Sequence, residues 1–149
     1  MLLIGVLLVA AAAAEPVELD LEAGFLPDPY ELEMDVAVND PQMVPFEGST
    51  LDIYMDAAEP HVILNYGGGG RLYIEFIATG DVSDPVLIVV TPREDALPLV
   101  NDDLFSLNPG VVVEEPEAGE YAIGIGSWIA GEISGTLYIS ETGFTTEAE

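Results

Sequence analysis

The sequence contains no cysteine and no lysine, and its only basic side chains are Arg71, Arg93 and His61. Without cysteine the chain can form no disulfide scaffold, thiolate zinc site or iron–sulfur cluster, and it has no cysteine nucleophile. A single histidine also excludes multi-histidine metal sites and two-histidine mechanisms. With 28 acidic residues and a formal net charge of −26, the chain lacks the basic face that neutralises phosphates. We therefore exclude nucleic acid as a partner.

Although the chain is strongly acidic, it does not have the composition of a disordered tail. Hydrophobic residues make up 50% of the chain, whereas acidic disordered segments are poor in apolar residues. The sequence therefore predicts a folded domain with a strongly acidic surface. Such a surface favours cationic ligands, metal ions or basic partners, and salt screens its self-repulsion.

The longest apolar run of the chain lies at the N-terminus, and it is short. Met1–Ala14 (MLLIGVLLVAAAAA) carries no charged side chain, and it is shorter than the roughly 18 residues that a membrane-spanning helix needs. It ends in Ala12–Ala14, which offers an A-x-A cleavage site. We expect a cleaved signal helix, with a buried N-terminal helix as the alternative. This interpretation predicts a secreted or periplasmic protein, and the lack of cysteine excludes a lipid-anchored lipoprotein.

Apolar and polar residues alternate with period two along most of the remaining chain. In Tyr30–Val38 every second side chain is apolar, while Glu31, Glu33 and Asp35 point to the other side, as in a strand with one face in water. Val86–Thr91 is apolar on both faces, which favours a strand covered on both sides. The other predicted strands are Leu51–Met55, His61–Tyr66, Leu72–Ala78, Leu97–Val100, Val111–Val113, Glu120–Trp128 and Ser134–Ser140.

Turn residues separate these runs, and nothing after Ala14 indicates a helix of about ten residues or more. The pattern predicts an all-β fold, an antiparallel β-sandwich of jelly-roll or Greek-key type with about eight or nine strands. We expect a monomer. The predicted organisation is a signal peptide at residues 1–14, an acidic flexible lead-in at 15–23, the sandwich domain at 24–141 and a flexible tail at 142–149.

Short motifs occur in a recognisable order in the second half of the chain. Asp84-Pro85 precedes an apolar strand, Asn101–Asp103 (NDD) follows the next one, Glu117–Tyr121 (EAGEY) opens another, and Gly135–Ile139 (GTLYI) lies in the last. Upstream, Gly24–Pro29 reads GFLPDP. Together these motifs resemble the bacterial pre-peptidase C-terminal (PPC-like) domain in its stand-alone exported form, over residues 24–140.

That family is a secreted β-sandwich often appended to extracellular peptidases. The resemblance implies an accessory or binding role rather than catalysis, with calcium in some members. The chain departs from the family in two ways: Pro92–Asp95 (PRED) replaces its P-D-G turn, and the cysteines of the stand-alone relatives are absent.

Acidic and amide side chains stand in the loops on either side of the strand predicted at Val86–Thr91. Successive strands of an antiparallel sandwich alternate in direction, so alternate loops share one end of the molecule. The returning strand therefore brings its C-terminal loop back to the end that holds the loop at 79–85. Because Ca²⁺ takes about six to eight oxygen ligands from flexible loops, we predict a calcium site at this end formed by Asp81, Asp84, Asn101, Asp102 and Asp103.

The alternative for these side chains is a set of Asx-turn hydrogen bonds within their own loops. The same count of strand directions places the Pro27–Pro29 turn and the Ile129–Ile133 loop at this end. The opposite end also holds acids, so acidity alone does not single out the calcium site; these acids are Glu94, Asp95, Glu114, Glu115 and Glu117.

Three aromatic residues are predicted to bind a ligand: Tyr54, Tyr73 and Trp128. Exposed aromatic rings on a sheet can stack on sugars or hold an extended peptide, and the alternative is that they fill the sandwich. His61 is interpreted as a structural residue rather than a catalytic base, and no serine lies in a G-x-S-x-G motif.

The function that we favour is an exported, non-catalytic module that binds an extracellular protein or glycan. Two alternatives stay open. A small hydrolase could use a pair of carboxylates, although so acidic a chain contains such pairs by chance. A purely structural envelope protein could be acidic for solubility alone.

Overall fold

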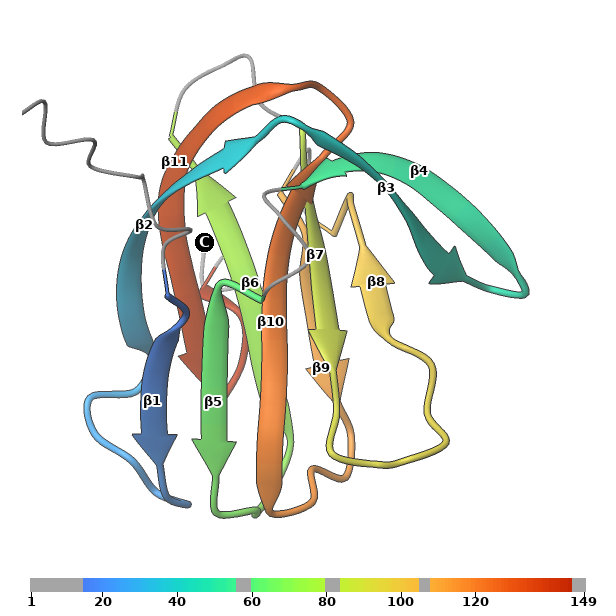
Figure 1. The fold of residues 1–149 in the computed structure, drawn as a ribbon. Coiled ribbons are helices and arrows are strands. Elements are labelled where there is room, and N and C mark those ends of the chain that lie inside the picture. The colour runs from blue at the N-terminus through green and yellow to red at the C-terminus, as the bar shows by residue number, and fades with distance from the viewer. Residues whose placement is uncertain (1–14, 56–59, 80–83, 105–107, 146–149) are drawn as a thin grey trace, which may run out of the picture.

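The computed structural model describes residues 15–55, 60–79, 84–104 and 108–145. Within these residues the chain forms eleven strands in two sheets that pack face to face (Figure 1). The prediction of an all-β sandwich is confirmed. The predicted signal segment at 1–14 lies outside the described residues. In the part of the chain that is described, no helix has the length and apolar character needed to cross a bilayer.

One sheet has seven strands and the other has four. In the larger sheet, β10 is central, because Ile123 pairs with Val62 of β5 and with Val89 of β7 on opposite edges. The strands of the larger sheet are β1 (Val17–Leu21), β3 (Asp40–Phe46), β4 (Ser49–Met55), β5 (Val62–Tyr66), β7 (Pro85–Val90), β8 (Leu99–Asn101) and β10 (Gly119–Ser127). The smaller sheet runs in the order β2 (Tyr30–Val38), β11 (Gly131–Ser140), β6 (Leu72–Ala78) and β9 (Gly110–Val113).

The main core lies between the two sheets and is formed by their inward-facing side chains. In β2 the alternation is as predicted: Val36 and Val38 are buried and Leu32 packs against the core, while the acids of the strand are exposed. Phe76 and Tyr121, from opposite sheets, are fully buried. Burying a large apolar side chain contributes about 1.5–3 kcal/mol, so this two-sided core is the main stabilising feature of the fold.

Strand β7 is covered on both faces, as its sequence predicts. Leu87 and Val89 belong to the main core, whereas Val86 and Ile88 belong to a second, smaller cluster. The β3–β4 hairpin supplies the other side of that cluster through two buried residues, Val44 and Ile53. The hairpin extends beyond the rest of the sandwich (Figure 1), and it covers apolar surface that water would otherwise reach.

Strand β3 was not predicted, because Asn39, Asp40 and Pro41 are residue types typical of a turn. Pro41 and Pro45 lack an N–H group and cannot donate to a neighbouring strand. They stand opposite Tyr54 and Thr50 of β4. Hydrogen-bonded and non-hydrogen-bonded pairs alternate along an antiparallel ladder, so two prolines four positions apart occupy pairs of the same kind. The other side of β3 is the free edge of the sheet. Proline on a free edge also discourages pairing with another chain. The strand is therefore compatible with its prolines only because it lies at the edge of the sheet.

The two predicted loose ends are also wrong in the part that the structure describes. The lead-in at 15–23 contains β1, which pairs in parallel with β5 and buries Leu19 and Leu21. In the tail, Phe144 is buried and the Thr145 amide donates a hydrogen bond of 2.5 Å to Glu75 Oε1. In both segments a few apolar residues among polar ones are buried against the sandwich. Residues 146–149 lie outside the described part.

The loops gather at two ends of the sandwich. The first, called the Trp128 end, holds the residues before β7 and the turn between β10 and β11: the Trp128 amide donates to the Asp84 carbonyl over 3.2 Å. The second, called the Glu117 end, holds the loops between β7 and β8 and between β9 and β10 (Figure 1). These two ends carry the candidate sites.

The Pro27–Pro29 turn does not lie at the Trp128 end as predicted. The Asp28 carboxylate accepts a hydrogen bond from Ser140 Oγ at the far end of β11, whereas β11 begins at Gly131 beside the Trp128 turn. The error arises because β3 was not predicted. Leaving out one strand reverses the direction that the count assigns to β2, so the turn before β2 was assigned to the wrong end.

Candidate functional site

The Trp128 end brings together three of the acids predicted to bind calcium. The Trp128 Nε1–H donates to Asp102 Oδ2 over 3.0 Å, and the Asp84 carbonyl accepts from Ser127 Oγ over 3.1 Å. Burial raises the pKa of the Asp84 carboxyl, and the nearby charges of Asp103 and Asp102 raise it further. Asp84, Asp102 and Asp103 therefore lie at one end of the sandwich, as the alternation of strand directions predicts.

The remaining members of that predicted site differ. Asn101 Oδ1 accepts a hydrogen bond from the Gly110 amide over 3.1 Å, so its oxygen joins β8 to β9. Asp81 lies outside the described residues. Among the residues that are described, no three carboxylate or histidine side chains are grouped so as to hold a metal ion. Calcium binding at this end stays a prediction.

The three aromatic residues predicted to bind a ligand lie in different surroundings. Tyr54 is half-buried and packs against the main core. Tyr73 is half-buried too, and its ring meets Phe144 edge-on at 5.1 Å. Trp128 is 37% exposed and lies beside the more exposed Ile129. Ligand binding by these rings stays a prediction, and Trp128 is the ring most open to solvent.

His61 and Ser127 both make hydrogen bonds to the backbone. His61 Nδ1 accepts from the Ile125 amide over 3.0 Å, which ties the start of β5 to β10. Ser127 Oγ donates to the Asp84 carbonyl and accepts from the Ile129 amide. These contacts agree with the interpretation of His61 as a structural residue.

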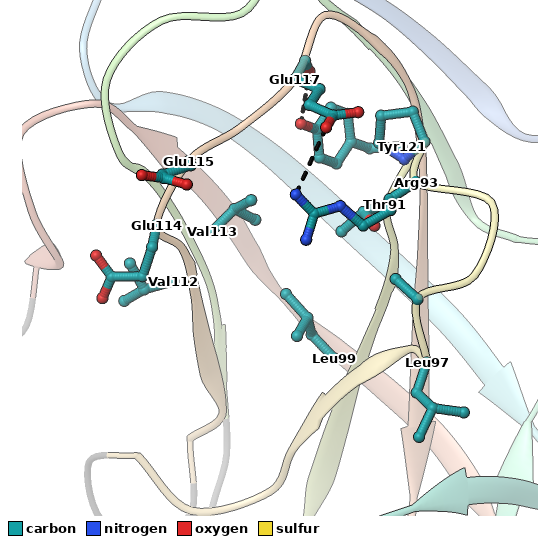
Figure 2. Close-up of a pocket in the computed structure, with 12 residues that line it drawn as sticks. Thr91, Arg93, Leu97, Leu99, Val112, Val113, Glu114, Glu115, Glu117 and Tyr121 are labelled. Carbon is teal, nitrogen blue, oxygen red and sulfur yellow. Dashed lines mark hydrogen bonds and ion pairs between the residues drawn. The ribbon is translucent and has the colours of Figure 1, made fainter.

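A pocket of about 290 Å³ opens at the Glu117 end, between the edge of the larger sheet at β8 and the edge of the smaller sheet at β9. Figure 2 shows Leu97, Leu99 and Arg93 on the side of β7 and β8, and Val112 and Val113 on the side of β9. Leu97 is 62% exposed although it is apolar. The lining residues are Thr91, Pro92, Arg93, Ala96, Leu97, Leu99, Val112, Val113, Glu114, Glu115, Glu117 and Tyr121.

The rim of the pocket is acidic, and both arginines of the chain contact it. Arg93 Nη2 lies 3.5 Å from Glu117 Oε1 (Figure 2), and Arg71 Nε lies 2.7 Å from Glu114 Oε2. All four side chains are more than half exposed. The loop at 114–118, which joins β9 to β10, is thus held by one ion pair on each side of Glu115.

Tyr121 anchors the same loop from inside the core. Its ring is fully buried and meets Tyr66 edge-on at 6.3 Å. Its hydroxyl donates a hydrogen bond of 2.7 Å to the Glu117 carbonyl (Figure 2). Burial raises the pKa of this phenol, and the charge of Glu117 adds to the effect. A hydrogen bond from the buried Tyr121 therefore joins the apolar floor of the pocket to its acidic rim.

The sequence pattern does not predict this pocket. Glu114, Glu115 and Glu117 stand out in the sequence only as further acids, because 28 acidic residues make any cluster unremarkable by composition. Two signals point to the site in retrospect. Arginine is so rare in this chain that its positions carry information, and Leu97 is a large apolar residue that follows Arg93, Glu94 and Asp95 closely.

Comparison with known proteins gives no family. No family model matches the chain, and no characterised protein matches its sequence, so the resemblance to PPC-like domains stays a prediction. Among solved structures, the chain is similar to Aeromonas hydrophila PliG, a periplasmic inhibitor of g-type lysozyme, with 10% identity over 84% of this chain and 97% of that one and a TM-score of 0.37.

The chain is also similar to a carbohydrate-binding module of Cellvibrio mixtus lichenase 5A, solved with cellotriose. The identity is 10% over 74% of this chain and 98% of that one, with a TM-score of 0.33. Both similarities are too low to transfer a ligand from either protein.

Proposed function

We propose that this protein is an exported, non-catalytic binding module that resembles PPC-like accessory domains and holds an apolar side chain of a partner protein in the pocket at the Glu117 end. The observation that carries the proposal is the pocket itself, whose apolar walls include Leu97, Leu99, Val112 and Val113. A volume of about 290 Å³ is at the lower limit of small-molecule sites. That volume suits one large side chain better than a whole small-molecule ligand.

The chemistry of the walls favours a protein over a glycan. Sugar recognition relies on exposed aromatic rings and on polar groups that face the ligand. The one aromatic residue in the lining, Tyr121, is buried, and its hydroxyl is already bonded to the Glu117 carbonyl. Aliphatic walls of this kind instead complement leucine, valine or phenylalanine side chains.

The exposure of the rim supports a binding role rather than carboxylate-assisted hydrolysis. A carboxylic acid that acts as a general acid near neutral pH is kept protonated by burial in an apolar site. Glu114 and Glu117 are instead 66% and 57% exposed, and each is paired with an arginine. Calcium at the Trp128 end would be a separate, stabilising feature.

The proposal is tested with a displayed peptide library selected on the protein, followed by binding measurements with the selected peptides. Leu97→Asp removes an exposed apolar wall of the pocket. Met43→Asp makes the same change on the β3–β4 hairpin, at a residue 73% exposed, and serves as the matched control. Burying a leucine-sized group is worth about 1.5–3 kcal/mol, so we expect Leu97→Asp to weaken binding at least tenfold and Met43→Asp to leave it unchanged.

Two results would contradict the proposal. One is a library that yields no binder, or binders that bind Leu97→Asp as tightly as the native protein. The other is cleavage of the selected peptides by the protein, detected by mass spectrometry, which would make the hydrolase alternative the better account.

A further inference from the structure

Both arginines of the chain meet the same loop. Arg71 precedes β6 and Arg93 follows β7, yet they pair with Glu114 and Glu117, only three positions apart in the loop at 114–118. The chain offers 28 acidic side chains. Both arginines nevertheless pair with acids of this one loop, and those two acids lie on the rim of the pocket.

These ion pairs contribute little to holding the fold together. Exposed pairs change a folding equilibrium by about fivefold at most, and all four side chains here are more than half exposed. Of the two pairs, Arg93–Glu117 is the longer, at 3.5 Å, and it alone has both members in the lining of the pocket. It is a contact that another cation can replace.

Between the two pairs, Glu115 is exposed and has no ion-pair partner in the part of the chain that the structure describes. It lines the pocket together with Glu114 and Glu117. A ligand that enters the pocket therefore passes three carboxylates whose negative charge is only partly neutralised by the two arginines. Across the whole chain, a net charge of −26 repels anions and steers cations towards the surface.

Resting on the proposed function, we propose that the partner is a basic protein. Its docking segment places an apolar side chain against Leu99 and Val112, and an adjacent arginine or lysine against Glu115 and Glu117. The partner's cation displaces Arg93 from Glu117. Arg93 thus occupies the rim of the free protein in place of the partner's basic side chain, and it lowers the affinity for that partner.

Two synthetic peptides separate the contributions of charge and of the apolar side chain. The first is acetyl-Gly-Leu-Gly-Arg-Gly-amide, and the second carries citrulline, which is neutral and nearly isosteric, in place of arginine. We expect the arginine peptide to bind several-fold more tightly than the citrulline peptide at low salt. The advantage should disappear at about 0.5 M NaCl, where the Debye length is only about 4 Å.

Four variants test the role of the rim. Arg93→Gln should tighten binding of the arginine peptide about two- to fivefold, the range of an exposed ion pair. Arg71→Gln makes the same charge change but leaves Glu115 and Glu117, the proposed contacts of the partner's cation, as they are, and it should tighten binding less. Glu117→Gln should weaken binding of the arginine peptide by a similar factor. Glu132→Gln, at an exposed residue of β11, is its matched control. The citrulline peptide should respond to none of the four.

The outcomes distinguish the two proposals. Equal binding of both peptides, abolished by Leu97→Asp, would overturn the basic partner and leave the pocket intact as an apolar site. The same holds if Arg93→Gln and Arg71→Gln tighten binding equally, because the effect would then come from net charge alone. If neither peptide binds to the native protein, both proposals fail.

Discussion

The hydrogen bond between Tyr121 and the Glu117 carbonyl links the stability of the core to the shape of the pocket, and Tyr121→Phe removes it without changing the shape of the ring. The lost bond is 2.7 Å long and its donor is fully buried. The net contribution of such a bond is about 1 kcal/mol. For a chain of this size the melting temperature should fall by about 3 °C.

The substitution should affect binding more than stability. Once the Glu117 carbonyl loses its donor, the loop at 114–118 keeps its two exposed ion pairs and the buried Pro116 but loses its hydrogen bond to the core. The acidic rim then becomes less ordered before the ligand arrives, and ordering it on binding costs affinity. We expect the arginine peptide to bind Tyr121→Phe severalfold more weakly.

The assay is thermal unfolding followed by circular dichroism, combined with calorimetric binding of the peptide. Tyr138→Phe is the matched control, because Tyr138 alternates with the buried Leu137 and Ile139 of β11 and is only half-buried. Equal melting temperatures and equal affinities for the two variants would refute the reasoning, since Tyr121 would then be only a packing residue.

Three further predictions concern the fold and its ends. Gly135→Ala should destabilise the protein by about 1–3 kcal/mol in urea unfolding, because the new methyl group would lie 2.5 Å from the Ile77 carbonyl oxygen; Gly70→Ala, with nothing within 4 Å, should be nearly neutral. Stability should fall as pH rises above about 10, because burial raises the pKa values of Tyr66 and Tyr121 in the folded state and the unfolded chain releases those protons first; a flat profile from pH 9 to 11 would contradict this. Calcium should raise the melting temperature through the acids of the Trp128 end, and identical curves in excess calcium and in chelator would remove that prediction.

The strands that the sequence predicted well are those with a strict alternation of faces. Tyr30–Val38 and Leu72–Ala78 were predicted with the bounds that the structure has. The two-sided character of Val86–Thr91 was informative too, since it anticipated a cover over the outer face of β7. Where one face is buried, shifting a strand by one residue would expose its whole apolar set, so the pattern fixes the register.

The strands that were missed are those whose sequence carries a competing signal. In Asp40–Phe46 the prolines indicate a turn, and only the position at a free edge makes them acceptable. In Val17–Leu21 the alternating acids indicate a loose segment, although Leu19 and Leu21 face the core. Both errors arise because edge position and parallel pairing depend on distant residues, which a local pattern does not contain.

The candidate sites were predicted unevenly for the same reason. Strand direction alone placed Asp84 and Asp102 at one end, and it failed for the Pro27–Pro29 turn because β3 was not counted. The pocket requires the edges of β8 and β9 to lie next to each other, and these edges belong to different sheets. Sequence periodicity describes each strand, but not which edges of the two sheets meet.

The central claim is that the pocket at the Glu117 end is the binding site, and methyl-resolved NMR tests it most directly. The protein is titrated with acetyl-Gly-Leu-Gly-Arg-Gly-amide while the methyl resonances of Leu99, Val112 and Ile129 are followed. We predict saturable shifts at Leu99 and Val112, which line the pocket, and none at Ile129, which follows Trp128 at the other end. Shifts at Ile129 with Leu99 and Val112 unmoved would contradict the account.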